Sequence, residues 1–244
     1  RAGRHRAAAF PRALRMSASS LAEAFATDGP LAANLDGYGL RQGQLAMAAE
    51  VAAAIAEGDT LVVEAGTGTG KTFAYLIPAL LSGRRVIVST GTRALQDQLF
   101  HRDLPTVSRA LGRPVRVALL KGRANYLCRH RLELAESAPM QGQLYGGERA
   151  LSARVARMRE WSLVTRRGDI AELPDFAETD PVWSLVTSTR ENCLGSECPR
   201  FEDCCVLAAR REAQAADLVV VNHHLLIADL MLKEGGFGDL LSSE

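Results

Sequence analysis

The stretch that decides the fold is Thr60-Leu-Val-Val-Glu64, followed without a break by Ala65-Gly-Thr-Gly-Thr-Gly70-Lys71-Thr72. Its first five residues are mostly apolar and β-branched, which predicts a strand. The glycines predict a turn, and residues 71–81, ended by Gly83, predict a helix. Strand, glycine-rich turn and helix in this order are typical of a loop that binds phosphate groups.

The loop matches the Walker A pattern, with Ala65 in place of the first glycine. Small residues let successive backbone N–H groups surround phosphate oxygens at a helix N-terminus. We expect Lys71 to reach the β- and γ-phosphates and Thr72 to ligate Mg²⁺, which makes them the candidate catalytic residues. A structural turn is the alternative, and it leaves the Lys-Thr pair unexplained. The nucleotide-binding candidates of the loop are Ala65, Gly66, Thr67, Gly68, Thr69, Gly70, Lys71 and Thr72.

Strand and helix patterns alternate on both sides of this loop. Helices are predicted at 21–25, 44–55 and 93–101, and further strands at 85–90, 115–120 and 217–222. This alternation indicates an α/β fold with a doubly wound parallel sheet. Between 122 and 211 the strand patterns disappear, and helices are predicted at 126–134, 148–164 and 205–214. The middle segment is therefore predicted to be a mainly helical insertion between strands of one domain.

The composition, at 47% hydrophobic and 23% charged residues, is that of a globular protein and excludes disorder and collagen. No apolar run approaches the roughly 18 residues that a membrane span needs. The net charge of +1 conceals 17 Lys and Arg against 6 acids in residues 84–167, and 5 against 15 in residues 168–244. The basic segment could attract a polyanion such as nucleic acid, or it could be a solvated helical face of an arginine-rich chain.

Five cysteines indicate thiol or metal chemistry. Their odd number favours a reducing compartment, by default the cytoplasm, over a disulfide framework. Cys193, Cys198 and Cys204 lie within twelve residues, and Cys128 stands 65 positions before Cys193. Four thiolates suit either Zn²⁺ or a [4Fe–4S] cluster, and the lack of paired C-x₂-C spacings favours iron. Free or buried thiols are the alternative. Successive side chains point to opposite faces of a strand, or about 100° apart around a helix. Only one of the adjacent residues Cys204 and Cys205 is therefore expected to ligate.

Five ordered motifs carry a resemblance to a known family. They are Tyr38-x-x-Arg41-x-x-Gln44-x-x-Met47, Glu64 to Thr72, Ser89-Thr90-Gly-Thr92-x-x-Leu95-Gln96-x-Gln98-Leu99, Lys121-Gly-Arg123-Ala-Asn125-Tyr126-x-Cys128 and Asn222-His223. With the cysteines, over about residues 17–244, they resemble the N-terminal portion of the iron–sulfur superfamily 2 DNA helicases. This is the XPD/DinG family, and the resemblance is strongest to its bacterial DinG/YoaA-like members.

The resemblance implies a P-loop NTPase (RecA-like) domain and a role for each motif. Arg41 and Gln44 would lie at the adenine of ATP, while Thr90, Thr92, Arg123 and Tyr126 would contact DNA. A [4Fe–4S] cluster would be held by Cys128, Cys193, Cys198 and Cys204. The implied activity is that of an ATP-dependent DNA helicase with Mg²⁺, moving 5′→3′ on single-stranded or forked DNA in repair or replication. A monomer, with a replication or repair protein as a further partner, is expected.

The resemblance also implies a division of the chain. Residues 1–16, rich in arginine, are expected to be a non-native or upstream leader. Residues 17–121 would form the first part of motor domain 1, 122–211 the cluster insertion and 212–244 the return to the motor. The family's Asp-Glu-Ala-His box does not occur in the printed residues, so these 244 residues alone are expected to lack ATPase activity. A non-motor nucleotide- and DNA-binding fragment with a zinc-stabilised insert is the alternative.

Arginines of the insertion are expected to form a basic surface for a displaced DNA strand. They are Arg123, Arg129, Arg131, Arg154, Arg157 and Arg159. Aromatic side chains could stack on bases, and Tyr126, Trp161 and Trp183 are the candidates, with burial in the core as the alternative for each.

Overall fold

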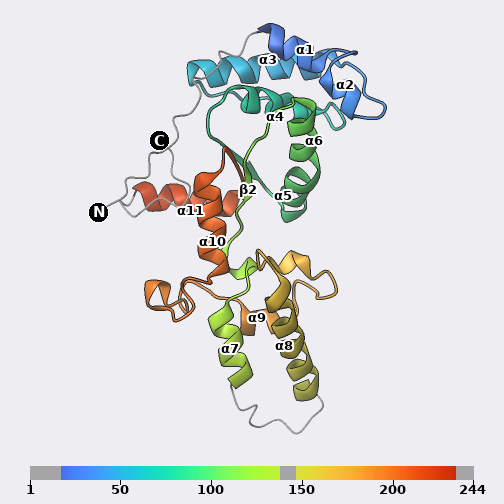
Figure 1. The fold of residues 1–244 in the computed structure, drawn as a ribbon. Coiled ribbons are helices and arrows are strands. Elements are labelled where there is room, and N and C mark those ends of the chain that lie inside the picture. The colour runs from blue at the N-terminus through green and yellow to red at the C-terminus, as the bar shows by residue number, and fades with distance from the viewer. Residues whose placement is uncertain (1–17, 138–146, 235–244) are drawn as a thin grey trace, which may run out of the picture. The chain divides into compact units, whose positions relative to one another are not determined.

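A computed structural model describes residues 18–137 and 147–234 (Figure 1), so the predicted leader lies outside the described residues. The chain begins with α1 (Ala18–Phe25), α2 (Pro30–Asn34), α3 (Gln42–Glu57) and α4 (Lys71–Leu81). Next come β1 (Val86–Thr90), α5 (Arg93–Gln98), the π-helix η1 (Leu99–Asp103), α6 (Leu104–Ala110) and β2 (Val117–Leu119). The following elements are η2 (Arg123–Asn125), α7 (Arg129–Ser137), α8 (Gly147–Val164), η3 (Ile170–Glu172), α9 (Val182–Val186) and η4 (Gly195–Glu197). The last are α10 (Cys205–Ala215), β3 (Leu218–Asn222) and α11 (His223–Glu234).

The three strands form a small parallel sheet in the order β1-β3-β2. Successive strands β1 and β2 are not neighbours, so the chain crosses over through α5, η1 and α6 between them, as parallel strands require. The apolar part of β3, Leu218 to Val221, is buried throughout. The small parallel sheet with its many helices fits the α/β P-loop class expected from the sequence.

Residues 60–64, predicted as a strand, do not form one. The Val62 side chain is 91% exposed, and Leu61 and Val63 are 38% and 40% exposed. A strand needs a neighbour that exchanges backbone hydrogen bonds with it, and none of the strands in the described residues pairs with this segment. The prediction of a strand here is wrong for this structure, although the composition of the segment favours one.

The contacts divide the chain into two compact units. The first unit comprises Arg1–Val117 and Ala216–Val220, and the second comprises Ala118–Ala215 and Val221–Glu244. In the first unit α3 packs along α4, and α1, α2 and α6 complete the core (Figure 1). The largest fully buried side chains of this unit include Phe25, Leu31, Leu76, Ile77 and Leu104. The packing of α3 on α4 is therefore the main helix contact of the unit that carries the glycine-rich loop.

In the second unit α7 packs against α8 and α9. Trp183 is at the centre of an aromatic cluster, with ring centroids 6.4 Å from Trp161 and 5.8 Å from Phe176. Both tryptophans are buried, at 5% and 6% exposure, so the core alternative holds for them and neither presents a stacking surface. Among the described residues, no helix is both long and apolar enough to cross a membrane.

Candidate functional site

The glycine-rich loop leads directly into α4, whose first residue is Lys71. Gly68 and Gly70 both have positive φ angles, +75° and +81°, in the left-handed region that glycine tolerates best. Gly70 is the residue before the helix, and the Thr69 hydroxyl donates to the carbonyl oxygen of Gly66 at 2.9 Å. The loop therefore turns sharply in front of a helix N-terminus, where backbone N–H groups and the helix dipole favour an anion.

The Lys71 ammonium group lies against the backbone of the same loop. It donates to the carbonyl oxygens of Ala65 at 2.7 Å and Gly66 at 2.6 Å. A fixed positive charge thus lies at the loop, at the helix terminus that already favours negative charge.

Two polar residues at the start of α3 hold the loop in place. Gln44, only 5% exposed, donates from Nε2 to the carbonyl oxygen of Gly70 at 2.9 Å. The Arg41 guanidinium donates to the carbonyl oxygen of Gly68. A Cβ atom on Gly70 would lie 2.1 Å from Gln44 Nε2, so any other residue here would displace the Gln44 side chain. The structure thus gives Arg41 and Gln44 a bracing role on the phosphate loop.

Sequence reasoning missed a polar contact behind the loop. Tyr75 lies one helical turn after Thr72 on α4, and both Thr72 and the carboxylate of Asp103 act on the pKa of its phenol. Burial is the main cause that raises the pKa of Tyr75, the Thr72 hydrogen bond lowers it and Asp103 raises it further. The i, i+3 spacing of Thr72 and Tyr75 on a helix was the signal that could have found the pair.

Thr90 and Thr92, the expected DNA contacts of the first unit, use their hydroxyl groups locally. The Thr92 hydroxyl caps α5 by accepting from the Leu95 N–H at 3.2 Å. Thr90 is 7% exposed, and its hydroxyl donates to the Thr92 carbonyl oxygen at 3.1 Å. Nearby, the Gln96 side chain is fully buried, and its amide has no hydrogen-bond partner among the described residues.

Four of the five cysteines line one cavity of the second unit, with a volume of about 30 Å³. They are the four proposed ligands, Cys128, Cys193, Cys198 and Cys204. Cys205 lines a different cavity, of about 40 Å³, beside Tyr126 and Asp169. The structure therefore separates the neighbours Cys204 and Cys205, which the sequence alone left open.

Backbone hydrogen bonds fix the chain at three of the four cysteines. The Cys128 N–H donates to the Val186 carbonyl oxygen at 2.7 Å, which anchors the first cysteine to the end of α9. A chain of turns joins Cys198 and Cys204, because the N–H groups of Cys198, Phe201 and Cys204 donate to the carbonyl oxygens of Gly195, Cys198 and Phe201, respectively. The Gly195 N–H donates to the sulfur of Cys193 at 3.5 Å. Burial raises the pKa of the Cys128 thiol, and the thiolates of Cys198 and Cys204 raise it further.

The side chains of the cysteine cavity can act as thiolate ligands. The donor set, four thiols around one cavity, is that of a Cys₄ iron–sulfur cluster or a structural zinc site. Within the described residues, no three His, Cys, Asp or Glu side chains form a group that could hold a metal ion.

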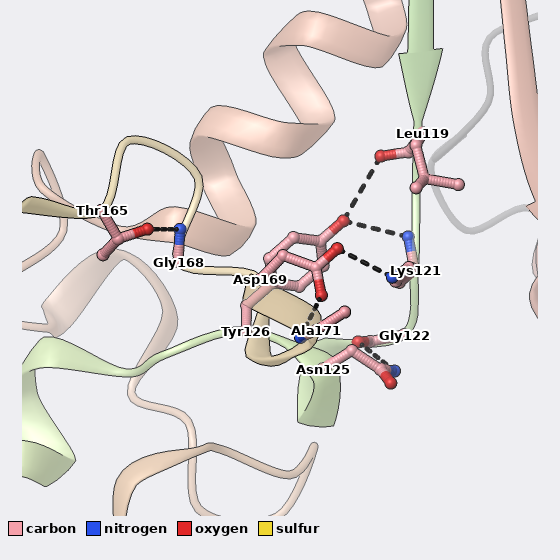
Figure 2. A network of polar contacts seen from close by, with 9 residues as sticks. All are labelled: Leu119, Lys121, Gly122, Asn125, Tyr126, Thr165, Gly168, Asp169 and Ala171. Atoms are coloured by element: carbon pink, nitrogen blue, oxygen red, sulfur yellow. Dashed lines mark hydrogen bonds and ion pairs between the residues drawn. The ribbon is translucent and has the colours of Figure 1, made fainter. Parts of the chain in front are cut away.

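The segment that leads to Cys128 is fastened by a buried polar network (Figure 2). The Lys121 ammonium and the Asp169 carboxylate form an ion pair of 2.8 Å, with side chains 4% and 14% exposed. The Tyr126 hydroxyl accepts from the Lys121 N–H at 3.0 Å and donates to the Leu119 carbonyl oxygen at 3.4 Å. In the residue after Tyr126, the Leu127 N–H donates to the carbonyl oxygen of Gly168. This network holds the backbone just before the first cysteine.

The expected contact of Tyr126 with DNA is not supported by this structure. The side chain is 3% exposed, and burial raises the pKa of its hydroxyl strongly. A stacking residue must present the face of its ring to solvent. The Tyr126 ring is instead part of the core, the alternative considered for it.

The predicted basic surface is partly neutralised. Arg154 pairs with Asp180, Arg157 with Glu160 at 3.2 Å and Arg159 with Glu136 at 3.7 Å. Two others donate to backbone carbonyl oxygens, Arg129 to Ser162 and Arg131 to Ser184. Arg123 is half-buried and lines the cysteine cavity. These arginines therefore hold the second unit together as well as giving it positive charge.

Comparisons with known proteins identify relatives of this chain. Residues 46–133 match the family model of the DEAD/DEAH box helicases. The chain is 53% identical over 219 residues to the ATP-dependent DNA helicase YoaA of Escherichia coli. The matched region covers 89% of this chain and 33% of that protein. The chain is 48% identical to YoaA of Haemophilus influenzae, over 91% of this chain and 34% of that protein.

A further relative is the ATP-dependent helicase DinG of Mycobacterium tuberculosis. It is 42% identical over 206 residues, or 78% of this chain and 31% of DinG. The chain thus spans about a third of the length of the relatives that it matches.

A glycine-rich loop at a helix N-terminus, in a chain with a small parallel sheet and many helices, fits the α/β P-loop class. Within that class, the matches show a DEAD/DEAH helicase domain, and YoaA and DinG helicases are close homologues of the chain.

Proposed function

We propose that the chain is the ATP-binding and cluster-bearing part of an ATP-dependent DNA helicase. The observation that carries the proposal is the braced phosphate loop, in which Gln44 and Arg41 hold the carbonyl groups of Gly70 and Gly68 in front of α4. A loop fixed in this way can bind triphosphate without first being ordered, which lowers the entropic cost of binding.

Each residue of the loop has a role in this proposal. Lys71 neutralises the β- and γ-phosphates, and its present carbonyl partners show that its ammonium reaches across the loop. Thr72 ligates Mg²⁺ through its hydroxyl. The backbone N–H groups of residues 66–71 bind the phosphate oxygens. Arg41 lies on the exposed side of the loop, where it can also meet the adenine of ATP.

We further propose that Cys128, Cys193, Cys198 and Cys204 hold a [4Fe–4S] cluster. The support is that these four thiols, and not Cys205, line one cavity. When bound, the cluster would supply a cross-link between distant segments of the second unit and a redox-active centre. The chain's own residues hold the ligands in place, Cys128 through Val186, Cys198 and Cys204 through the chain of turns, and Cys193 through the N–H of Gly195.

The proposed substrate is single-stranded or forked DNA, with 5′→3′ movement in the complete enzyme and roles in repair or replication. The names of the relatives and the excess of arginine in residues 84–167 support DNA as the polyanion. Phosphate contacts from arginines weaken as salt rises, so binding to single-stranded DNA should fall steeply with salt concentration. Five free cysteines suit the reducing cytoplasm, and a monomer is proposed.

The test is the affinity for ATP with Mg²⁺, measured by calorimetry on the wild type and on Lys71→Ala. Loss of one charge-assisted phosphate contact costs roughly 1.5–3 kcal/mol, so binding should weaken by about 10- to 100-fold. Arg93→Ala, which removes a cation of the same unit at the start of α5, is the control. Equal affinity of the wild type and Lys71→Ala would overturn the proposal of a phosphate loop.

A further inference from the structure

The last turn of α8 presents two large apolar side chains to solvent. Leu163 is 72% exposed and Val164 is 76% exposed, whereas the two residues before them, Trp161 and Ser162, are buried. Scattered apolar side chains are common on protein surfaces, but here two neighbours both remain uncovered. The core of the second unit therefore does not account for this pair.

Hydrogen bonds fix the backbone on both sides of the exposed pair. The Glu172 carboxylate oxygen Oε2 accepts from Trp161 Nε1 at 3.3 Å and from the Thr165 hydroxyl at 2.6 Å. The Thr165 hydroxyl oxygen also accepts from the Gly168 N–H at 2.7 Å. A ligand that covers the pair therefore meets an ordered segment, which lowers the entropic cost of binding.

Positive charge follows directly after the exposed pair. Arg166 is exposed, and its guanidinium makes no hydrogen bond or ion pair within residues 18–137 and 147–234. Arg167 pairs with Glu212 at 3.2 Å. Three residues of chain span at most about 11 Å, so one short ligand segment can reach both Leu163 and Arg166. We call Leu163, Val164 and Arg166 the α8 tip.

Single-stranded DNA matches the chemistry of the α8 tip. Base faces are hidden by stacking in a duplex, whereas in a single strand they are free to pack on apolar side chains, and arginine pairs with phosphate. Charge favours a polyanion as well, because residues 84–167, which include the tip, carry 17 Lys and Arg against 6 acids. The expected ligand is therefore an anionic chain with exposed apolar faces.

We propose that the α8 tip is a contact site for single-stranded DNA, in which Leu163 and Val164 pack on unpaired bases and Arg166 pairs with a backbone phosphate. The inference rests on the proposed function, in which single-stranded or forked DNA is the substrate. It extends that function, because the apolar contact selects unpaired bases and the phosphate contact does not. Arg154, Arg157 and Arg159 are engaged by carboxylates, whereas Arg166 is not engaged by any described residue.

The experiment measures the binding of the whole chain to a labelled oligothymidine and to a duplex of equal length, by fluorescence anisotropy over a series of NaCl concentrations. Leu163→Ser/Val164→Ser should weaken binding to oligothymidine about 3- to 10-fold, and leave duplex binding and the salt dependence unchanged. Arg166→Gln should weaken binding to both DNAs. It should also reduce the slope of log K against log salt by about 0.7 on the single strand.

Leu134→Ser is the matched control, because it removes a leucine of α7 that is 52% exposed and lies outside the α8 tip. It should leave both affinities unchanged. If the wild type binds oligothymidine and the tip variants bind it equally well, the proposed function stands and the tip is not a DNA contact. An acidic protein partner would then fit this surface instead.

Two further outcomes would also overturn the inference. Equal losses on oligothymidine and duplex in Leu163→Ser/Val164→Ser would contradict a contact with unpaired bases. A wild type that binds no single-stranded DNA at any salt concentration would overturn the proposed DNA substrate together with the role of the tip. The substituted side chains are exposed, so the free energy of unfolding of each variant should equal that of the wild type.

Discussion

A side chain at Gly70 would meet the Gln44 amide and would hold the backbone in a left-handed conformation. Gly70 combines a φ of +81° with the amide of Gln44 at 2.1 Å from the place of a Cβ atom. Gly83, at the other end of α4, has a similar φ of +66° but open space around it. Substitution of Gly83 therefore tests backbone strain alone, whereas substitution of Gly70 tests backbone strain together with the contact between the loop and Gln44.

Gly70→Ala and Gly83→Ala should each lower the free energy of unfolding by about 1–2 kcal/mol, the cost of a left-handed alanine. Only Gly70→Ala should displace Gln44 and so weaken ATP binding. Urea denaturation measures the first effect, and calorimetric titration with Mg-ATP measures the second. Equal ATP affinities for the two variants would contradict a bracing role for Gln44.

The Asp217 carboxylate makes a contribution to the stability of the folded state that depends on pH. Its carboxylate is bonded to Arg116, at 2.8 Å from Nη2, and this hydrogen bond is the main cause that lowers the pKa of Asp217 below its ordinary 3.8. A lowered pKa stabilises the folded state above pH 3.8 and loses this effect as the pH falls through the folded-state value. Asp217→Asn should therefore lower the melting temperature at pH 7 but flatten its fall below pH 4. The melting temperature of both proteins is measured from pH 7 to pH 3. A constant difference between the two melting temperatures over this range would refute the prediction.

At the scale of elements, α4 could be predicted to the residue because its start and end are encoded locally, by Gly70 and by Gly83 after its last turn. Residues 60–64 could not, because a strand depends on a partner that the local sequence does not specify. The helix predicted at 126–134 begins at Arg129 instead, since Tyr126 and Leu127 form isolated bridges with Asp169 and Thr187. Such long-range pairings leave no periodic pattern in the sequence.

The buried polar network before Cys128 joins different elements of the second unit, and the sequence did not reveal it. Lys121 and Asp169 are 48 positions apart, and only the fold makes them a buried pair. Asp169→Asn keeps the acceptor for the Ala171 N–H but leaves the Lys121 charge buried without its partner carboxylate. Because an unpaired buried charge is costly, we expect a loss of about 3–5 kcal/mol in the free energy of unfolding.

The double variant Lys121→Met/Asp169→Asn removes both charges and should recover most of that loss. Denaturation followed by the fluorescence of Trp161 and Trp183, both in the same unit, reports on the relevant core. A double variant less stable than Asp169→Asn alone would show that the ion pair is not the main contribution of these residues.

For the whole molecule, the sequence indicated the class of protein more reliably than the contacts of single residues. The phosphate loop was predictable because it is a local pattern of glycines followed by Lys71 and Thr72. The bracing by Arg41 and Gln44, the burial of Tyr126 and the pairing of the arginines were not, because they depend on tertiary packing. The separation of Cys204 from Cys205 came from the helix that starts at Cys205.

Hydrolysis is a property of the whole active site. No strand pattern in the printed residues ends in an Asp-Glu pair, which phosphoryl transfer needs to hold Mg²⁺ and to orient the attacking water. We expect these 244 residues by themselves to bind ATP without measurable turnover. A phosphate-release assay with single-stranded DNA tests this, and turnover that disappears in Lys71→Ala would contradict it.

The most direct test of the central claim is the iron, acid-labile sulfide and zinc content of the anaerobically purified protein. The wild type is compared with Cys204→Ser and Cys205→Ser, adjacent residues that line different cavities. We predict about four irons with matching sulfide per chain in the wild type and in Cys205→Ser, and loss of both in Cys204→Ser. About one zinc per chain without iron, or equal loss of iron in both variants, would contradict the account.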